Sequence, residues 1–302
     1  MELKKVLFYT KQILSSTLSV GERTGSIVRH DVKKYVFRLS RKTERVLNDM
    51  LTKELLSYIL DIGEQMLVSG AEVNRVEDSI SRICKAYDAK RVDVFTITSS
   101  IVVSLQSRSG NTLTQTRRIL KYSTDLDKLD RLNNLSHYIC AHKPEAEYIR
   151  NEIEKIGIRR IYSPIVQYLV YGMIAGTFTI FYGGDLNDAA VSAAIGMILK
   201  SAITFIQRLD KNVFIVNILC SFVVGMLGVL LVRTGIGHSF DKIAIGNIML
   251  LIPGLALTNS IRDIISGDTI AGLLRLCEAI LVALSISFGF GLVSVFVGGM
   301  FK

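Results

Sequence analysis

Residues 163–182 read SPIVQYLVYGMIAGTFTIFY, and this stretch decides the class of fold. Ser163 followed by Pro164 is a strong helix start, because serine caps free backbone N–H groups and proline is tolerated at the first helical position. The run after them carries no charged side chain, and its length is close to the roughly 20 residues that a helix needs to cross a bilayer. It predicts a transmembrane helix, which the residues GGD at 183–185 end.

Further apolar runs follow towards the end of the chain, and several of them are rich in small residues. Together they predict an α-helical polytopic membrane domain over residues 161–302, with about five transmembrane helices. The fourth run is short and is broken by Pro253-Gly254. The expected spans are about 164–182, 186–206, 213–232, 243–258 and 273–297.

The chain has 302 residues, and its composition changes near Arg160. Hydrophobic residues make up 49% of the whole, but charged residues are dense before this point and sparse after it. A soluble domain followed by a membrane domain explains this division better than a single soluble core.

Residues 51–160 have the patterns of an α/β domain. Apolar positions recur at helical spacing up to Gly70, and Ser69 with Glu72 forms an S-x-x-E capping box that opens a second helix. Helix starts return at Thr124 and Pro144. Period-two alternation and a turn at 109–111 predict strands over 91–98, 101–106 and 112–120.

The formal charge of +9 comes largely from residues 1–50, a basic N-terminal extension. Nucleic-acid binding would need a recognisable motif on a basic face, and the sequence contains none. Contact with anionic lipid or simple solvation is the preferred interpretation, and an amphipathic helix on the membrane surface is one form of it. Lys11 and Gln12 interrupt the first apolar stretch, which argues against a signal peptide.

Basic residues near the ends of the spans predict the orientation, because they concentrate on the cytoplasmic side. The larger group lies at the ends nearer the α/β domain, so we expect that domain in the cytoplasm and a multi-pass protein of the plasma (cell inner) membrane. This group is Arg159, Arg160, Arg208, Lys211, Arg262 and Arg275, against Arg233, Lys242 and Lys302 at the other ends.

Polar residues in or beside membrane spans need a reason, because the bilayer core solvates them poorly. Pro253-Gly254 is the most informative site, since proline leaves backbone groups that only protein or a water-filled cavity can receive. A plain kink is the alternative. The candidates for a substrate or ion pathway are Asp185, Asp188, Lys200, Asn217, Asn247, Pro253, Gly254, Asn259, Arg262, Asp263, Asp268, Arg275 and Glu278.

Several of these candidates have simpler interpretations that stay open. Lys200 can snorkel to the headgroups, and Asn217 and Asn247 can hydrogen-bond between helices. Arg275 and Glu278 have the spacing of an i,i+3 ion pair.

The sequence carries no signature of an enzyme or a metal site. Its four cysteines are far apart, without CxxC or Cys/His metal spacing, and its histidines have no ligand spacing. The serine, histidine and aspartate residues form no nucleophile elbow. We therefore expect no catalytic residue, no metal and no cofactor.

An ordered series of motifs resembles the threonine/serine exporter family over nearly everything after Leu51. In the α/β domain it runs from Gly63-Glu64 through SGAEVNRVE at 69–77 to VDVF at 92–95, and it includes Gly70, Glu72, Arg75 and Glu77. In the membrane domain the matching stretches are FYGGDLNDA at 181–189, LIPG at 251–254, NSIRD at 259–263, GD at 267–268 and GLLR at 272–275.

The resemblance implies secondary export of small amino acids, and this chain looks like the first subunit of a split form that works with a small second membrane protein. A proton gradient would be the driving force, and self-association stays open. One alternative is export of a dicarboxylate such as succinate by the same architecture. Others are a membrane-anchored hydrolase or a sensor domain.

Overall fold

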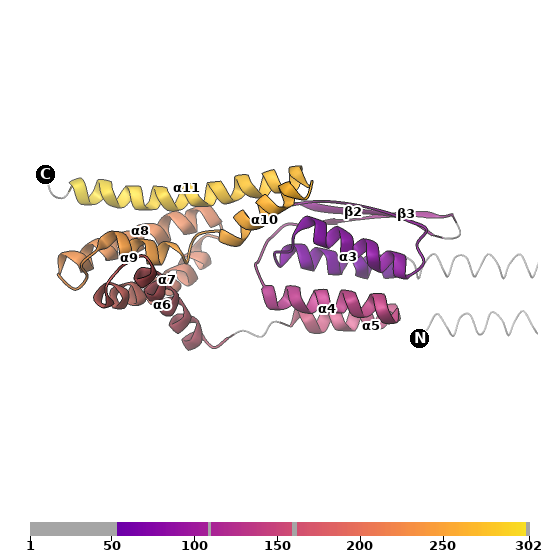
Figure 1. Ribbon diagram of the computed structural model, residues 1–302, viewed down its shortest axis with the longest axis horizontal. Coiled ribbons are helices and arrows are strands. Elements are labelled where there is room, and N and C mark those ends of the chain that lie inside the picture. Colours follow the sequence, from indigo (N-terminus) through magenta and orange to yellow (C-terminus); the bar gives the residue numbers. More distant parts are fainter. Residues whose placement is uncertain (1–52, 108–109, 159–161, 300–302) are drawn as a thin grey trace, which may run out of the picture.

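The computed structural model describes residues 53–107, 110–158 and 162–299, and the basic extension over 1–50 lies outside this range. Residues 53–158 combine helices with a small sheet (Figure 1). A helix over 53–68 precedes α3. The elements that follow are α3 (Val73–Ala86), β1 (Arg91–Ile97), β2 (Ser100–Gln106), β3 (Thr112–Arg118), α4 (Leu126–His142) and α5 (Ala146–Gly157).

The sheet is antiparallel with strand order β1-β2-β3. Val94 lies opposite Val103, and Leu105 lies opposite Leu113. Strand side chains alternate between faces, so Ile101, Val103 and Leu105 of β2 all point into the core. In Figure 1 the sheet lies along one side of α3, and α4 and α5 lie along the other.

The second half of the described chain consists of helices, of which four are long and apolar enough to cross a membrane. They are α6 (Pro164–Phe181), α7 (Leu186–Leu209), α8 (Val213–Arg233) and α11 (Thr269–Gly299). Many large apolar side chains on them remain exposed, as expected for surfaces that face lipid or another membrane protein. The predicted polytopic membrane domain is therefore present.

The fourth of the expected spans is not one helix. It is divided into α9 (Phe240–Ile248) and α10 (Gly254–Ile265), which explains why four candidate spans are found rather than about five. Before the break the chain tightens, since the N–H groups of Leu250 and Leu251 return to carbonyls only three residues back. Pro253 then lacks an N–H and starts a new helix at Gly254.

Small residues let the membrane helices approach closely. A Cβ at Gly172 or Gly176 of α6 would lie 3.1 Å from a backbone carbonyl oxygen of α7, and one at Gly246 of α9 would lie 2.6 Å from the Ala175 carbonyl oxygen. These contacts build the bundle around α7 and α8 without large side chains.

The two halves of the chain are joined by α11, which runs along the membrane helices and reaches the sheet (Figure 1). Ala271, near its start, is 2% exposed and belongs to the same apolar core as α3 and β2. The start of α11 therefore packs against the α/β part, and the rest packs against α8 and α10.

Candidate functional site at the domain junction

The break between α9 and α10 opens beside the α/β part of the chain. The first turn of α10 has no side-chain cap, and its leading N–H groups lack partners within the helix. Pro253, Leu255 and Ala256 from this turn line a cavity of about 340 Å³. A helix N-terminus attracts negative charge, so the cavity is suited to an anionic group.

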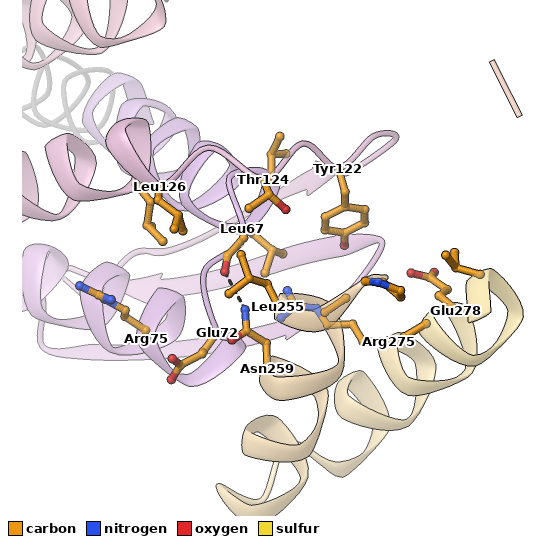
Figure 2. A pocket seen from close by; sticks show the side chains of 17 residues that line it. Leu67, Glu72, Arg75, Tyr122, Thr124, Leu126, Leu255, Asn259, Arg275 and Glu278 are labelled. Carbon is orange, nitrogen blue, oxygen red and sulfur yellow. Dashed lines mark hydrogen bonds between the residues drawn. The ribbon is translucent and has the colours of Figure 1, made fainter. Parts of the chain in front are cut away.

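The opposite wall of this cavity comes from the α/β part, including Leu67, Gly70, Glu72 and Thr124 (Figure 2). Most of the surface is apolar, and charged groups lie around it. Two cations and two anions line the cavity: Arg75, Arg275, Glu72 and Glu278. Its volume lies within the range of about 300–1,000 Å³ that is common for small-molecule sites.

Arg275 of α11 is the central cation of this region and is 8% exposed. Its Nη1 donates to Asp263 Oδ2 at 3.0 Å, whereas its Nη2 is buried without a hydrogen bond of good geometry among the described residues, and the Tyr122 hydroxyl also interacts with the guanidinium. A guanidinium offers donors in a planar fork, so a carboxylate in the cavity can bind the free edge while Asp263 keeps the other.

Asp263 of α10 connects the membrane part to the N-terminus of α3. It is 1% exposed, and its Oδ1 accepts a hydrogen bond from the Val73 N–H at 3.0 Å. The local capping box expected from Ser69 and Glu72 is wrong, because Glu72 occupies the N-cap position without a side-chain bond. Ser69 is instead buried at the end of the preceding helix.

Two neighbouring side chains of α10 reach the same segment. Arg262 forms an ion pair with Glu72, and Asn259 Nδ2 donates to the Gly70 carbonyl oxygen at 2.9 Å. Gly70 has a φ of 101°, which favours glycine and turns its carbonyl towards α10. We call these contacts, together with that of Asp263, the α10 clamp.

Burial raises the pKa of a tyrosine and of two acids around the clamp. It raises the pKa of Tyr122 to about 12, and the nearby Arg275 guanidinium opposes this shift. Burial also raises the pKa of Glu77 and of Asp268, and the charge of Asp268 adds to the shift at Glu77. Glu77 Oε1 accepts from the Thr96 N–H at 2.6 Å, so this motif glutamate ties α3 to β1.

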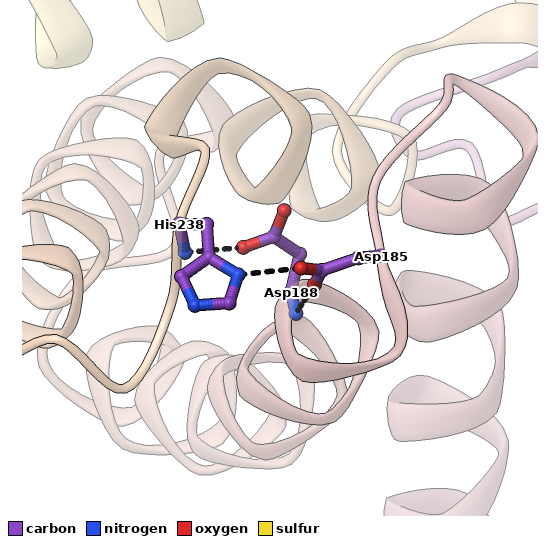
Figure 3. Close-up of side chains that lie close together, drawn as sticks. All are labelled: Asp185, Asp188 and His238. Carbon is purple, nitrogen blue, oxygen red and sulfur yellow. Dashed lines mark hydrogen bonds and ion pairs between the residues drawn. The ribbon is translucent and has the colours of Figure 1, made fainter.

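Asp185 and Asp188 lie far from this junction, at the start of α7, where they meet a residue that sequence reasoning missed. This residue is His238, which lies in the segment between α8 and α9, and Figure 3 shows both carboxylates beside it. Asp185 caps α7 through the Asp188 N–H at 2.7 Å, and its Oδ2 lies 2.5 Å from His238 Nδ1. Asp188 Oδ1 accepts from the His238 and Ser239 N–H groups at 2.7 and 3.1 Å.

These contacts shift the pKa values of Asp185 and His238. Hydrogen bonds from the Asp188 N–H and from His238 lower the pKa of Asp185, and Asp185 raises the pKa of His238. The ligand atoms of the three side chains lie within 4.8 Å of one another. They already satisfy one another, so the cluster acts as a tie between two loops.

The remaining candidates lie within the helix bundle. Lys200 Nζ is 5.2 Å from the ring centre of Tyr171, and Asn247 donates to Ser192 Oγ at 2.9 Å and to the Ile243 carbonyl. Asn217 is buried in α8. Arg275 pairs with Asp263, and no Arg275–Glu278 ion pair is formed.

Sequence reasoning thus named nine residues that meet at the junction, Glu278 among them, but it missed Tyr122 and Thr124. Their only sequence signal was that Thr124 precedes a helix start. The nine are Gly70, Glu72, Arg75, Pro253, Asn259, Arg262, Asp263, Arg275 and Glu278.

The sequence matches one family and several curated proteins. The profile of a family described as "Putative threonine/serine exporter" matches residues 57–297. A "Probable threonine/serine exporter" of Mycobacterium tuberculosis is 22% identical over 280 residues, which cover 91% of this chain and 52% of that protein. A "Threonine/serine exporter" of Corynebacterium glutamicum is 23% identical over 240 residues, which cover 76% and 49%.

Yeast proteins match the same region. "Pheromone-regulated membrane protein 10" of Kluyveromyces lactis is 23% identical over 252 residues, which cover 80% of this chain and 25% of that protein. No solved structure matches the chain. The chain spans about half the length of the two bacterial relatives.

Proposed function

Because the chain belongs to the threonine/serine exporter family, we propose that it is part of a secondary exporter that moves small amino acids out of the cell. The names of its bacterial relatives support this class of substrate. In this proposal the chain is a transporter and not an enzyme, and a proton gradient drives it.

The observation that carries the proposal is the unpaired Nη2 of Arg275 in the wall of the junction cavity. An arginine so deeply buried is costly unless its donors find partners. A substrate carboxylate would supply the missing partner, and the uncapped N-terminus of α10 would add favourable electrostatics.

The ammonium group of an amino-acid substrate needs an acceptor in the same cavity. Glu278 stands one turn after Arg275 on α11 and lines the same cavity, so it can accept from an ammonium group. Glu72 lies across the cavity but is occupied by Arg262. The free edge of Arg275 and the Glu278 carboxylate match the two charges of a zwitterion. A dicarboxylate would have to bind Arg75 as its second cation and would lie beside two carboxylates, Glu72 and Glu278.

The positions of the basic residues support an assignment of the α/β part to one side of the membrane. Arg208 and Lys211 lie at the α7–α8 connection. Gly289 meets Ser221 and Val293 meets Gly225, so α8 and α11 run in the same direction and this connection lies at the end of the bundle nearer to the start of α11. Positive charge favours the cytoplasm, so we place the α/β part there and the Asp185–His238 tie outside, in the plasma membrane.

A second membrane protein completes the exporter in this proposal. Exposed apolar side chains on α6 and α11 offer surface for another helical subunit. Small polar side chains and glycines on such faces allow close packing.

The test is efflux of radiolabelled threonine from proteoliposomes that contain this chain with and without a candidate partner. We expect efflux only from the pair. Glu278→Gln should lower efflux about tenfold through a higher KM, because a neutral amide loses the charge-assisted bond to the ammonium group. Glu278 is exposed, so its replacement should leave folding intact.

The matched control is Glu154→Gln on α5, which removes an exposed carboxylate paired with Arg150 away from the cavity. It should leave efflux unchanged. Normal KM in Glu278→Gln, or competition by succinate as strong as by threonine, would remove the zwitterion site.

A further inference from the structure

The α10 clamp holds the segment that covers one side of the cavity. Asn259, Arg262 and Asp263 stand three and four positions apart, so they lie on one face of α10. All three contact the short stretch between Gly70 and Val73. Gly70 and Glu72 from this stretch are also cavity wall.

One residue of the clamp, Asp263, also caps the N-terminus of α3. Without Asp263, the first N–H groups of α3 have no side-chain acceptor, since Glu72 makes no such bond. Helix ends without caps fray within their first turn. The order of the cavity wall therefore depends on a carboxylate from the membrane part.

The same carboxylate holds Arg275, the cation that we assign to the substrate. Asp263 binds Arg275 with one oxygen and Val73 with the other. A substrate bound at Arg275 would contact both α11 and the wall that Gly70 and Glu72 form, so it would favour the docked arrangement.

We propose that residues 70–72 form a gate over the cavity, closed while Asp263 caps α3 and open when this cap is released, with Val73 and Val76 remaining in the apolar core. This proposal rests on the proposed function, because it takes the cavity as the substrate site. Substrate stabilises the closed gate, and movement of α10 away from α3 opens it.

Hydrogen–deuterium exchange of the reconstituted chain tests the gate. Threonine at saturating concentration should slow exchange of the amides in residues 73–76. Asp263→Ala should speed their exchange roughly tenfold without threonine, which is the scale of a lost cap. Asp125→Ala is the matched control, because Asp125 caps α4 through the Lys128 N–H at 3.1 Å and its removal should change exchange only in α4.

Cross-linking provides the functional measurement. In the Glu72→Cys/Arg262→Cys double variant, a bifunctional thiosulfonate reagent should stop efflux, and reductant should restore it. Unchanged efflux after complete cross-linking would overturn the gate. If the variant lacks efflux before treatment, hydrogen–deuterium exchange and calorimetry on the unaltered chain decide. Threonine binding without any change of exchange at residues 73–76 would overturn the gate alone. Absence of threonine binding would overturn the proposed function.

Discussion

Asp263 and Val73 are 190 positions apart, yet the Asp263 carboxylate accepts the Val73 N–H at 3.0 Å and forms the N-terminal cap of α3. The same side chain pairs with Arg275 at 3.0 Å. One buried carboxylate thus joins three elements, α3, α10 and α11. The junction is held by a few polar contacts rather than by a large apolar interface.

Removing Asp263 should be far more costly than removing an exposed acid. Asp263→Ala leaves Arg275 buried without an anion, and loss of one partner of such a pair costs about 3–5 kcal/mol. The free energy of unfolding in detergent, followed by the fluorescence of a dye bound to buried thiols, measures this change.

The exposed pair Arg150–Glu154 supplies the comparison, since Glu154→Ala should cost less than about 1 kcal/mol. The Asp263→Ala/Arg275→Leu double variant should recover part of the lost stability, because no unpaired charge remains. Equal stabilities of Asp263→Ala and Glu154→Ala would mean that the buried pair does not hold the junction.

Two glycines of α11 should respond oppositely to alanine. A Cβ at Gly289 would overlap Ser221 Oγ and the Ile218 carbonyl oxygen of α8, whereas one at Gly291 meets nothing within 4 Å. Gly289→Ala should therefore lower stability by about 1–3 kcal/mol through overpacking. Gly291→Ala should be neutral or gain up to about 1 kcal/mol from helix propensity. Thermal unfolding in one detergent compares them, and similar melting temperatures would place α8 and α11 further apart.

The Asp185–His238 tie should give the protein a pH-dependent component of stability. Asp185 raises the pKa of His238, so the folded state binds the proton more tightly than the unfolded state, whose value lies near 6.5. The contribution is complete below that ordinary value and is lost as pH rises through the raised one.

His238→Gln isolates this contribution, because it keeps the backbone N–H that donates to Asp188. Its melting temperature should fall below that of the unaltered chain at about pH 6 and meet it at about pH 9. A constant difference across this range would show that the imidazole does not titrate against Asp185.

The orientation predicts which cysteines an impermeant thiol reagent can reach. Ile236, between α8 and α9, is 55% exposed. In a variant without Cys140 and Cys277, Ile236→Cys should label in intact cells. Asp93→Cys on β1, an exposed site in the α/β part, should label only after lysis. The reverse pattern would invert the topology.

The sequence predicts the parts of this structure that depend on local chemistry. Ser163-Pro164 starts α6, and proline at 253 ends one helix and starts another, because these effects act within a single turn. The strands are predicted within two residues at each end. The cap of α3 could not be predicted, since an apparently complete local signal in Ser69 and Glu72 is replaced by a distant carboxylate.

The partners of charged side chains could not be predicted from sequence spacing either. The spacing of Arg275 and Glu278 favours a pair within one helix, but Arg275 turns to Asp263, which is buried and offers a stronger partner. His238 carries no signal at all, because its relation to Asp185 exists only after α6, α7 and α8 have packed.

The length of α11 has a consequence for the depth of the junction. Its 31 residues extend about 46 Å at a rise of about 1.5 Å per residue, against a hydrocarbon core of about 30 Å. The surplus reaches towards the α/β part, and Arg275, in the second turn, lies within it. With the remainder of α11 in the hydrocarbon core, we expect the cavity at the level of the lipid phosphates, which would compete for the same guanidinium. Bilayer thickness and headgroup charge thereby become variables of transport, since a thinner or more tilted arrangement moves the site relative to those phosphates.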